Sequence, residues 1–72
     1  MTQTEKILDY MERHGSITPL EAMNELGIMR LGARIFDLKE SGINIITERV
    51  TEKNRFGDLC SFARYRLEKE NA

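Results

Sequence analysis

The sequence is poor in residues that build disulfides and metal sites. Its 72 residues include one cysteine, Cys60, and one histidine, His14. A lone cysteine cannot close an internal disulfide, and a single cysteine with a single histidine does not supply the ligands of a zinc site. We therefore expect a fold without a disulfide or a metal ion.

Long apolar runs are also missing. No segment approaches the roughly 18 consecutive apolar residues of a membrane span, and the N-terminal MTQTEKIL lacks the apolar stretch of a signal peptide. A hydrophobic content of 40% with 32% charged residues is typical of a soluble globular chain. We expect a single domain over residues 1–72, located in the cytoplasm and without membrane contact.

Patterns that carry catalysis are absent as well. No nucleophile lies beside a base, and no pair of carboxylates is spaced for general acid–base catalysis. No glycine-rich, phosphate-binding loop follows a strand. The expectation is a protein that is not an enzyme, with no catalytic residues, no cofactor and no small-molecule substrate.

Charge is nearly balanced overall but unevenly distributed. The net charge is −1, yet residues 1–26 hold two basic and five acidic residues, whereas residues 27–67 hold eight basic and five acidic residues. A positive C-terminal part can contact phosphates, and so mild an excess predicts weak, strongly salt-dependent binding of nucleic acid by a monomer.

Two helix starts are marked by a threonine followed by a glutamate at the spacing of a capping box. The pairs are Thr2 with Glu5 and Thr18 with Glu21. Pro19 strengthens the second start, because proline fits the first helical position. These signals predict helices from about Gln3 to His14 and from Pro19 to Gly27, where glycine ends the second.

A third helix follows from the apolar residues Leu31, Ile35 and Leu38, which recur at helical spacing. We expect it to begin almost directly after Gly27 and Ile28 and to end at Gly42.

Beyond Gly42 the pattern changes to that of strands. INIITERV is β-branched, LCSFARYRL alternates apolar with polar residues, and TEKNRFGD between them holds turn formers. The alternation places Ala63, Tyr65 and Leu67 on one face, and Ile17 is expected to add a very short strand. Three helices followed by a hairpin form a mainly α fold with a C-terminal β-hairpin, the order of a winged helix-turn-helix.

The third helix carries the first group of candidate DNA contacts. With its apolar stripe turned inward, Met29, Ala33 and Phe36 lie near the opposite side, and Arg30 and Asp37 lie on one flank. Arg30 is the candidate for reading a base edge, because arginine pairs well with guanine in the major groove. The alternative is a solvated arginine that pairs with Asp37.

Arg34 and Phe36 each leave alternatives open. Arg34 lies nearer the apolar stripe, where it either pairs with Glu21 or Glu25 and braces two helices, or clamps a phosphate. Phe36 could contact a thymine methyl group, pack against the hairpin or form a protein interface. Of these, packing within the domain is the expectation.

The hairpin tip and the start of the second helix supply the remaining candidates. Arg49, Lys53, Asn54 and Arg55 lie at or beside the tip, where they would follow the DNA backbone or enter the minor groove. A solubilising surface is the alternative. Thr18 and the free N–H groups of its helix could hold another phosphate.

The segment GSITPLEAMNELGIMRLGARIFDLKESGINIITERV resembles the small helix-turn-helix proteins common in phages and prophages of low-GC Gram-positive bacteria. Their recurrent pattern is I-T-P-x-E-A-x-x-x-L-G-I-x-R-L-x-A-R-I-x-D-L-x-x-x-G, and the likeness continues into KNRFG and ARYRL. The resemblance implies a winged helix-turn-helix with presumed DNA binding. The pattern positions it marks are Arg30, Arg34, Asp37, Asn54, Arg55 and Gly57. Relatives often carry a polar residue at Phe36 and alanine or serine at Gly32.

Two functions from different classes follow. The first is a DNA-binding protein of phage or mobile-element type, a small transcriptional regulator or recombination accessory factor that binds double-stranded DNA. Because one such unit buries only about 600 to 1,000 Å² on DNA, useful specificity suggests either a homodimer or cooperative neighbours on the DNA. The second is an adaptor or inhibitor that binds a host protein through Phe36, Met29 and the acidic N-terminal half, since the fold alone does not prove DNA binding.

Overall fold

The chain forms three helices followed by one antiparallel hairpin. The computed structural model describes residues 1–68, with elements α1 (Gln3–His14), α2 (Pro19–Leu26), α3 (Leu31–Glu40), β1 (Ile45–Lys53) and β2 (Leu59–Leu67). This order confirms the expected mainly α architecture with a C-terminal hairpin. None of the helices within residues 1–68 has the length and apolar character needed to cross a membrane.

Local capping fixes the first two helices where the sequence predicts them. Thr2 Oγ1 accepts the Glu5 N–H at 3.2 Å, and Glu5 Oε1 accepts the Thr2 N–H at 3.0 Å. Thr18 and Glu21 repeat both bonds at 3.2 and 3.0 Å. Gly27 ends α2 at φ 69°, a left-handed conformation that favours glycine. Both helix starts are therefore determined within four residues of sequence.

The start of α3 differs from the expectation. The helix begins at Leu31 and not almost directly after Ile28. Ile28 is 2% exposed, and its N–H donates to the Ala22 carbonyl at 3.0 Å. This residue therefore closes the C-terminal end of α2 and does not start α3. Arg30 has φ −113° and ψ 60°, outside the helical region, and caps α3. Met29 consequently lies in the turn and not on the face of the helix.

The core joins all three helices to the base of the hairpin. Its buried members are Ile7, Met11, Ile17, Ala22, Ile28, Leu31, Ile35 and Leu38. Ile17 also exchanges two backbone hydrogen bonds with Tyr65, of 2.8 and 2.9 Å, which confirms the expected short strand. The half-buried Tyr65 and Leu67 pack against the core, as the alternation of β2 predicts. The base of the hairpin is thus held by the backbone bonds to Ile17 and by the packing of Tyr65 and Leu67 against the core.

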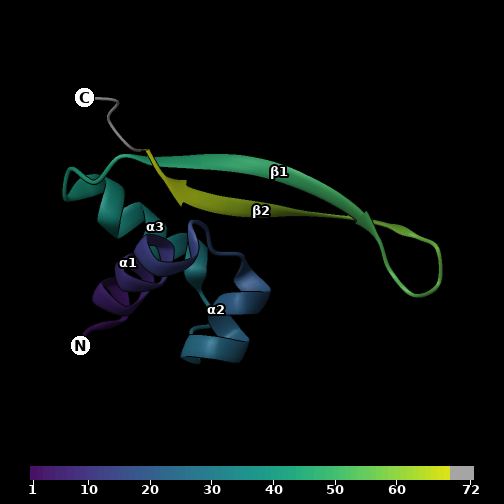
Figure 1. Cartoon of the computed structure of the whole chain (residues 1–72), viewed down its shortest axis with the longest axis horizontal. Helices are drawn as coiled ribbons and strands as arrows, with labels where there is room; N and C mark the ends of the chain where they lie inside the picture. The colour runs from purple at the N-terminus through teal and green to yellow at the C-terminus, as the bar shows by residue number, and fades with distance from the viewer. Residues whose placement is uncertain (69–72) are drawn as a thin grey trace.

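The rest of the hairpin extends away from the helices as an arm (Figure 1). Its register runs from Ile45 opposite Leu67 to Lys53 opposite Leu59. The molecule accordingly measures 40 × 29 × 21 Å. Residues near the tip are exposed on every side, so their side chains are available for contacts outside the chain.

Candidate nucleic-acid interface

The helix α3 turns its apolar stripe inward and leaves an aromatic ring outside. The inward residues are at most 6% exposed, namely Leu31, Ile35 and Leu38. Phe36 is 61% exposed, so the expectation that it packs within the domain is wrong. The hairpin reaches this side of α3 one turn earlier, where a Cβ on Gly32 would lie 3.8 Å from the Tyr65 hydroxyl, and the Phe36 ring remains exposed to solvent. Phe36 therefore belongs to the free outer face of α3.

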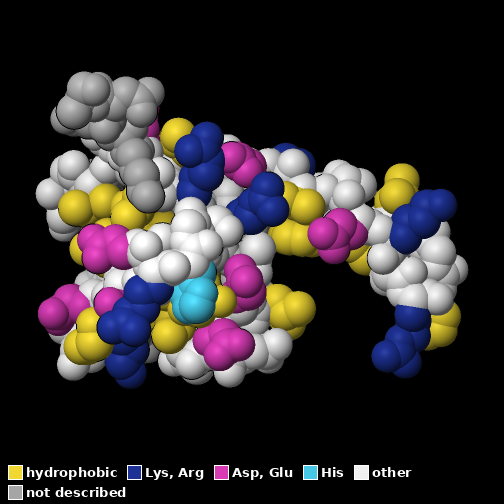
Figure 2. All heavy atoms as spheres, in the orientation of Figure 1, with side chains coloured by type: hydrophobic (Ala, Val, Ile, Leu, Met, Phe, Trp, Pro, Cys, Tyr) yellow, Lys and Arg dark blue, Asp and Glu magenta, His cyan; other side chains and the backbone are white. Residues whose placement is uncertain are grey.

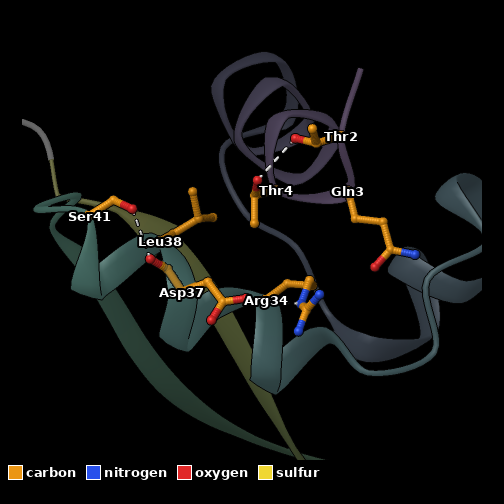
Figure 3. A pocket seen from close by; sticks show the side chains of 7 residues that line it. All are labelled: Thr2, Gln3, Thr4, Arg34, Asp37, Leu38 and Ser41. Atoms are coloured by element: carbon orange, nitrogen blue, oxygen red, sulfur yellow. Dashed lines mark hydrogen bonds and ion pairs between the residues drawn. The ribbon is translucent and has the colours of Figure 1, made fainter.

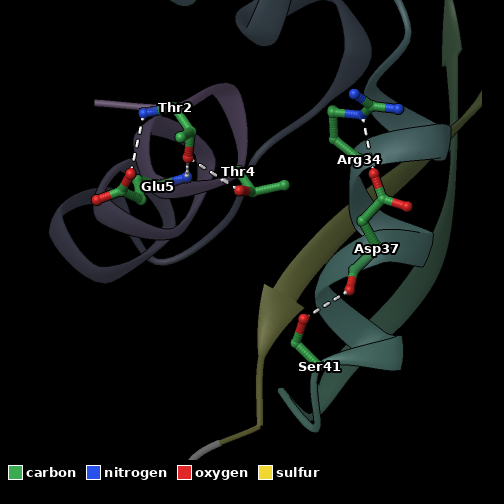
Figure 4. A network of polar contacts seen from close by, with 6 residues as sticks. All are labelled: Thr2, Thr4, Glu5, Arg34, Asp37 and Ser41. Atoms are coloured by element: carbon green, nitrogen blue, oxygen red, sulfur yellow. Dashed lines mark hydrogen bonds and ion pairs between the residues drawn. The ribbon is translucent and has the colours of Figure 1, made fainter.

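Arg34 pairs with Asp37 on its own helix. Its Nε lies 3.2 Å from Asp37 Oδ2 (Figure 4). The expected brace to Glu21 or Glu25 is wrong, and so is the alternative pairing of Arg30 with Asp37. Side chains three residues apart are neighbours on a helix, whereas the carboxylate of Glu21 is already engaged in its capping box. This pairing reduces the charge that Arg34 offers to a phosphate.

A shallow hollow of about 420 Å³ surrounds this ion pair (Figure 3). It lies between the start of α1 and one flank of α3, and its lining residues are Thr2, Gln3, Thr4, Arg34, Asp37, Leu38 and Ser41. Arg34 Nε is buried there and has no well-aligned hydrogen bond, although it lies close to the carboxylate. No local signal links residues 2–4 to α3, and the sequence therefore did not predict this neighbourhood.

Several predicted residues meet at the start of α3. Arg30 and Arg34 line a second hollow of about 460 Å³ together with Met29, Ala33 and Gln3. Met29 is 81% exposed, and Arg30 is exposed and forms no ion pair within residues 1–68. The structure thus groups the candidate base-contacting residues at one end of α3.

One face of the hairpin continues from α3. Lys39, near the end of that helix, donates from Nζ to Thr47 Oγ1 at 3.4 Å. Because side chains alternate along a strand, Arg49 and Lys53 begin on the same face of β1 as Thr47. Both are exposed, and neither forms an ion pair within the part of the chain that the structure describes. Exposed cations without carboxylate partners therefore extend from the end of α3 along this face of the hairpin.

On the opposite face of the hairpin two arginines share one carboxylate. Glu48 Oε2 accepts a hydrogen bond from Arg64 Nη2 at 3.0 Å, and Glu48 Oε1 accepts one from Arg66 Nε. These two bonds lower the pKa of the Glu48 carboxyl below its ordinary value of 4.5. Arg64 and Arg66 account for part of the positive excess in the sequence, but they are occupied within the fold.

Asn54 shapes the loop at the tip of the hairpin. Its Oδ1 accepts the N–H groups of Phe56 at 2.9 Å and Asp58 at 3.1 Å. Its backbone N–H donates to the Asp58 carbonyl at 2.9 Å, and its carbonyl accepts the Gly57 N–H at 3.0 Å. Arg55 is exposed inside this loop. Figure 2 shows the far end of the hairpin standing clear of the helices, with Lys and Arg side chains (dark blue) on it.

Comparison with known families identifies this arrangement. The profile of the winged helix-turn-helix domain matches residues 2–70. The chain belongs to this family. In the winged helix-turn-helix, α2 and α3 form the helix-turn-helix and the hairpin is the wing. No curated protein and no solved structure matches the chain.

Thr18 lies at the start of α2, beside the face of the wing that carries Phe62 and Arg64. Its hydroxyl and its N–H are both engaged with Glu21, so the carboxylate of Glu21 occupies the position at the helix start where a phosphate would sit. Thr18 lines another hollow, with Leu20 and Phe62 among its neighbours. Residues 1–68 contain no group of three His, Cys, Asp or Glu side chains placed to hold a metal ion.

The Glu48 pairs of the wing predict a pH dependence of stability. Because the pKa of Glu48 is lower in the folded chain than in the unfolded chain, its ionised form stabilises the fold above about pH 4.5. This contribution is lost as the pH falls through the lowered pKa. We expect the variant Glu48→Gln to be less stable than wild type at pH 7 and equal to it at low pH, by urea unfolding. A constant difference at all pH values would contradict the assignment.

Proposed function

We propose that this winged helix-turn-helix domain binds double-stranded DNA, with α3 in the major groove and the wing along the backbone. The observation that carries the proposal is a set of exposed cations without carboxylate partners in residues 1–68. Four of these cations lie at the start of α3 and on the wing, namely Arg30, Arg49, Lys53 and Arg55. Cations neutralised within the protein contribute little to phosphate binding, and these four are free to contribute. Family membership favours the same function.

In this arrangement the outer face of α3 reads the bases. Arg30 stands at the N-terminal end of the helix and suits bidentate contact with guanine. Met29 and Ala33 lie beside it and would limit how closely the helix approaches the groove floor. Phe36, 61% exposed, suits contact with a thymine methyl group. Arg34 and Asp37 would act as a pair that positions the helix against a phosphate.

The proposed biological role is that of a small transcriptional regulator or recombination accessory factor of phage or mobile-element type. It would act in the cytoplasm by binding and not by catalysis. A single winged helix buries only about 600 to 1,000 Å² on DNA. We therefore propose that two copies act together, as a homodimer or as neighbours on adjacent sites.

A DNA titration at two salt concentrations tests the proposal. We expect wild type to bind an arbitrary duplex at about 50 mM salt and to lose affinity steeply by about 200 mM, because binding releases counterions. Arg30→Ala and Arg55→Ala should each weaken binding and flatten the salt dependence by roughly one phosphate contact. Arg13→Ala is the matched control, since Arg13 lies on α1 and is paired with Asp9. Absence of binding at about 50 mM salt would reject DNA as the ligand.

The second candidate is an adaptor that binds a protein, and exposed apolar side chains favour it. Phe36 is 61% and Met29 is 81% exposed at the same end of the molecule. Large exposed apolar groups mark interaction surfaces. If the titration shows no DNA binding, this surface becomes the leading site, and Phe36→Ala should weaken association with the protein partner without lowering the stability of the fold.

A further inference from the structure

The tip of the wing carries a second exposed aromatic ring, which the proposed contacts do not use. Phe56 is 81% exposed, and Leu59 beside the loop is 70% exposed. Neither belongs to the hydrophobic core or packs against it. Phe56 is therefore not part of the core that holds the domain together, and its ring is free to contact a ligand at the tip.

The loop presents this ring on a fixed backbone. Four hydrogen bonds to Asn54 hold the backbone of the loop, and one of them is donated by the N–H of Phe56 itself. Gly57 has φ 83°, a left-handed conformation that completes the tight turn. A ring on a preformed turn loses less conformational freedom on binding than a ring on a mobile loop.

The charges around the Phe56 ring indicate which kind of ligand the tip contacts. Lys53 precedes the loop and Arg55 is the direct neighbour of Phe56, and neither has a carboxylate partner in residues 1–68. Asp58 also lies in the loop, so residues 53–58 carry a net charge of only +1. A net charge of +1 is too small for the loop to bind DNA strongly through phosphate contacts alone. The combination of an apolar point with flanking cations matches the wedges that enter the minor groove of DNA.

We propose that Phe56 is a wedge that inserts between base steps from the minor groove and kinks the duplex, while Lys53 and Arg55 contact the flanking phosphates. This inference rests on the proposed DNA binding and adds a mechanical function to it. Only the side chain of Phe56 needs to enter the minor groove, and an inserted apolar side chain unstacks the base step and bends the DNA by roughly 20 to 90°.

Energy transfer between fluorophores at the two ends of an arbitrary-sequence duplex tests the inference. Wild type should shorten the distance between the ends, and Phe56→Ala should abolish this change. The salt dependence of binding should stay as in wild type, because phenylalanine carries no charge. Leu20→Ala is the matched control, since it removes an exposed apolar side chain from α2 to which no DNA contact is assigned, and it should leave the bend intact.

A tryptophan probe gives an independent readout of the same contact. The chain contains no tryptophan, so Phe56→Trp introduces a single reporter at the tip. Its fluorescence should be quenched on DNA binding, and the bend should persist. DNA that wild type binds but does not bend, or an equal loss of bending in Leu20→Ala, would overturn the wedge while leaving DNA binding in place. Failure of wild type to bind DNA would overturn both proposals.

Discussion

Replacing Ile17 by alanine is expected to unfold a large part of the population at 25 °C. Ile17 is fully buried, and its backbone is bonded twice to Tyr65, so this one residue ties the helices to the wing. Truncating a buried isoleucine to alanine costs about 2 to 5 kcal/mol of unfolding free energy. A core in a chain of this size supplies only about 3 to 5 kcal/mol in total. Urea unfolding followed by circular dichroism measures the loss.

Leu20→Ala provides the control for that measurement. Leu20 is three residues further along the chain and also aliphatic, but it is 65% exposed. Removing an exposed side chain usually changes the unfolding free energy by no more than about 0.5 kcal/mol. Equal effects of Ile17→Ala and Leu20→Ala would show that Ile17 is not part of the core that holds the wing.

The features that sequence predicts well are those set by neighbouring residues. Thr18 and Glu21 fix the start of α2 through bonds that span three residues. The alternation of β2 gives the inward side of Tyr65 and Leu67, because the period of a strand is a local property. The order of helices and hairpin, and with it the winged helix-turn-helix, follows from such local signals.

The features that sequence misses depend on contacts between distant segments. The helix α3 starts only at Leu31 because Ile28 is buried and bonded to α2. The spacing of apolar residues in the sequence does not predict that contact. The exposure of Phe36 depends on the direction in which the hairpin leaves the core. The pairing of Arg64 and Arg66 with the one carboxylate of Glu48 requires the strand register that places them near it. Charge counting along the chain therefore overstated the number of cations available to DNA.

The wing should dominate the salt dependence of DNA binding. Each phosphate contact contributes about −0.9 to the slope of log affinity against log salt. If Arg30, Arg49, Lys53 and Arg55 each contact one phosphate, their contribution to the slope is about −3.6, and affinity falls roughly a hundredfold between about 50 and 200 mM salt. Replacing Arg49, Lys53 and Arg55 together by alanine should leave only the contribution of Arg30. The fall over the same range then shrinks to about fourfold.

Net charge alone could produce part of this effect, so the control must change charge equally. The triple replacement takes the formal net charge from −1 to −4, and so does replacing Lys6, Arg13 and Arg66 by alanine. Arg13 and Lys6 lie on α1, Arg66 lies at the base of the wing opposite Ile46, and both arginines are ion-paired, so this variant leaves the unpaired wing cations Arg49, Lys53 and Arg55 in place. Binding isotherms of both variants across a salt series decide between the two explanations. If binding depends on the position of the cations, only the wing variant flattens the slope. Equal flattening of the slope in both variants would mean that the salt dependence follows the total charge of the protein and not the positions of the wing cations.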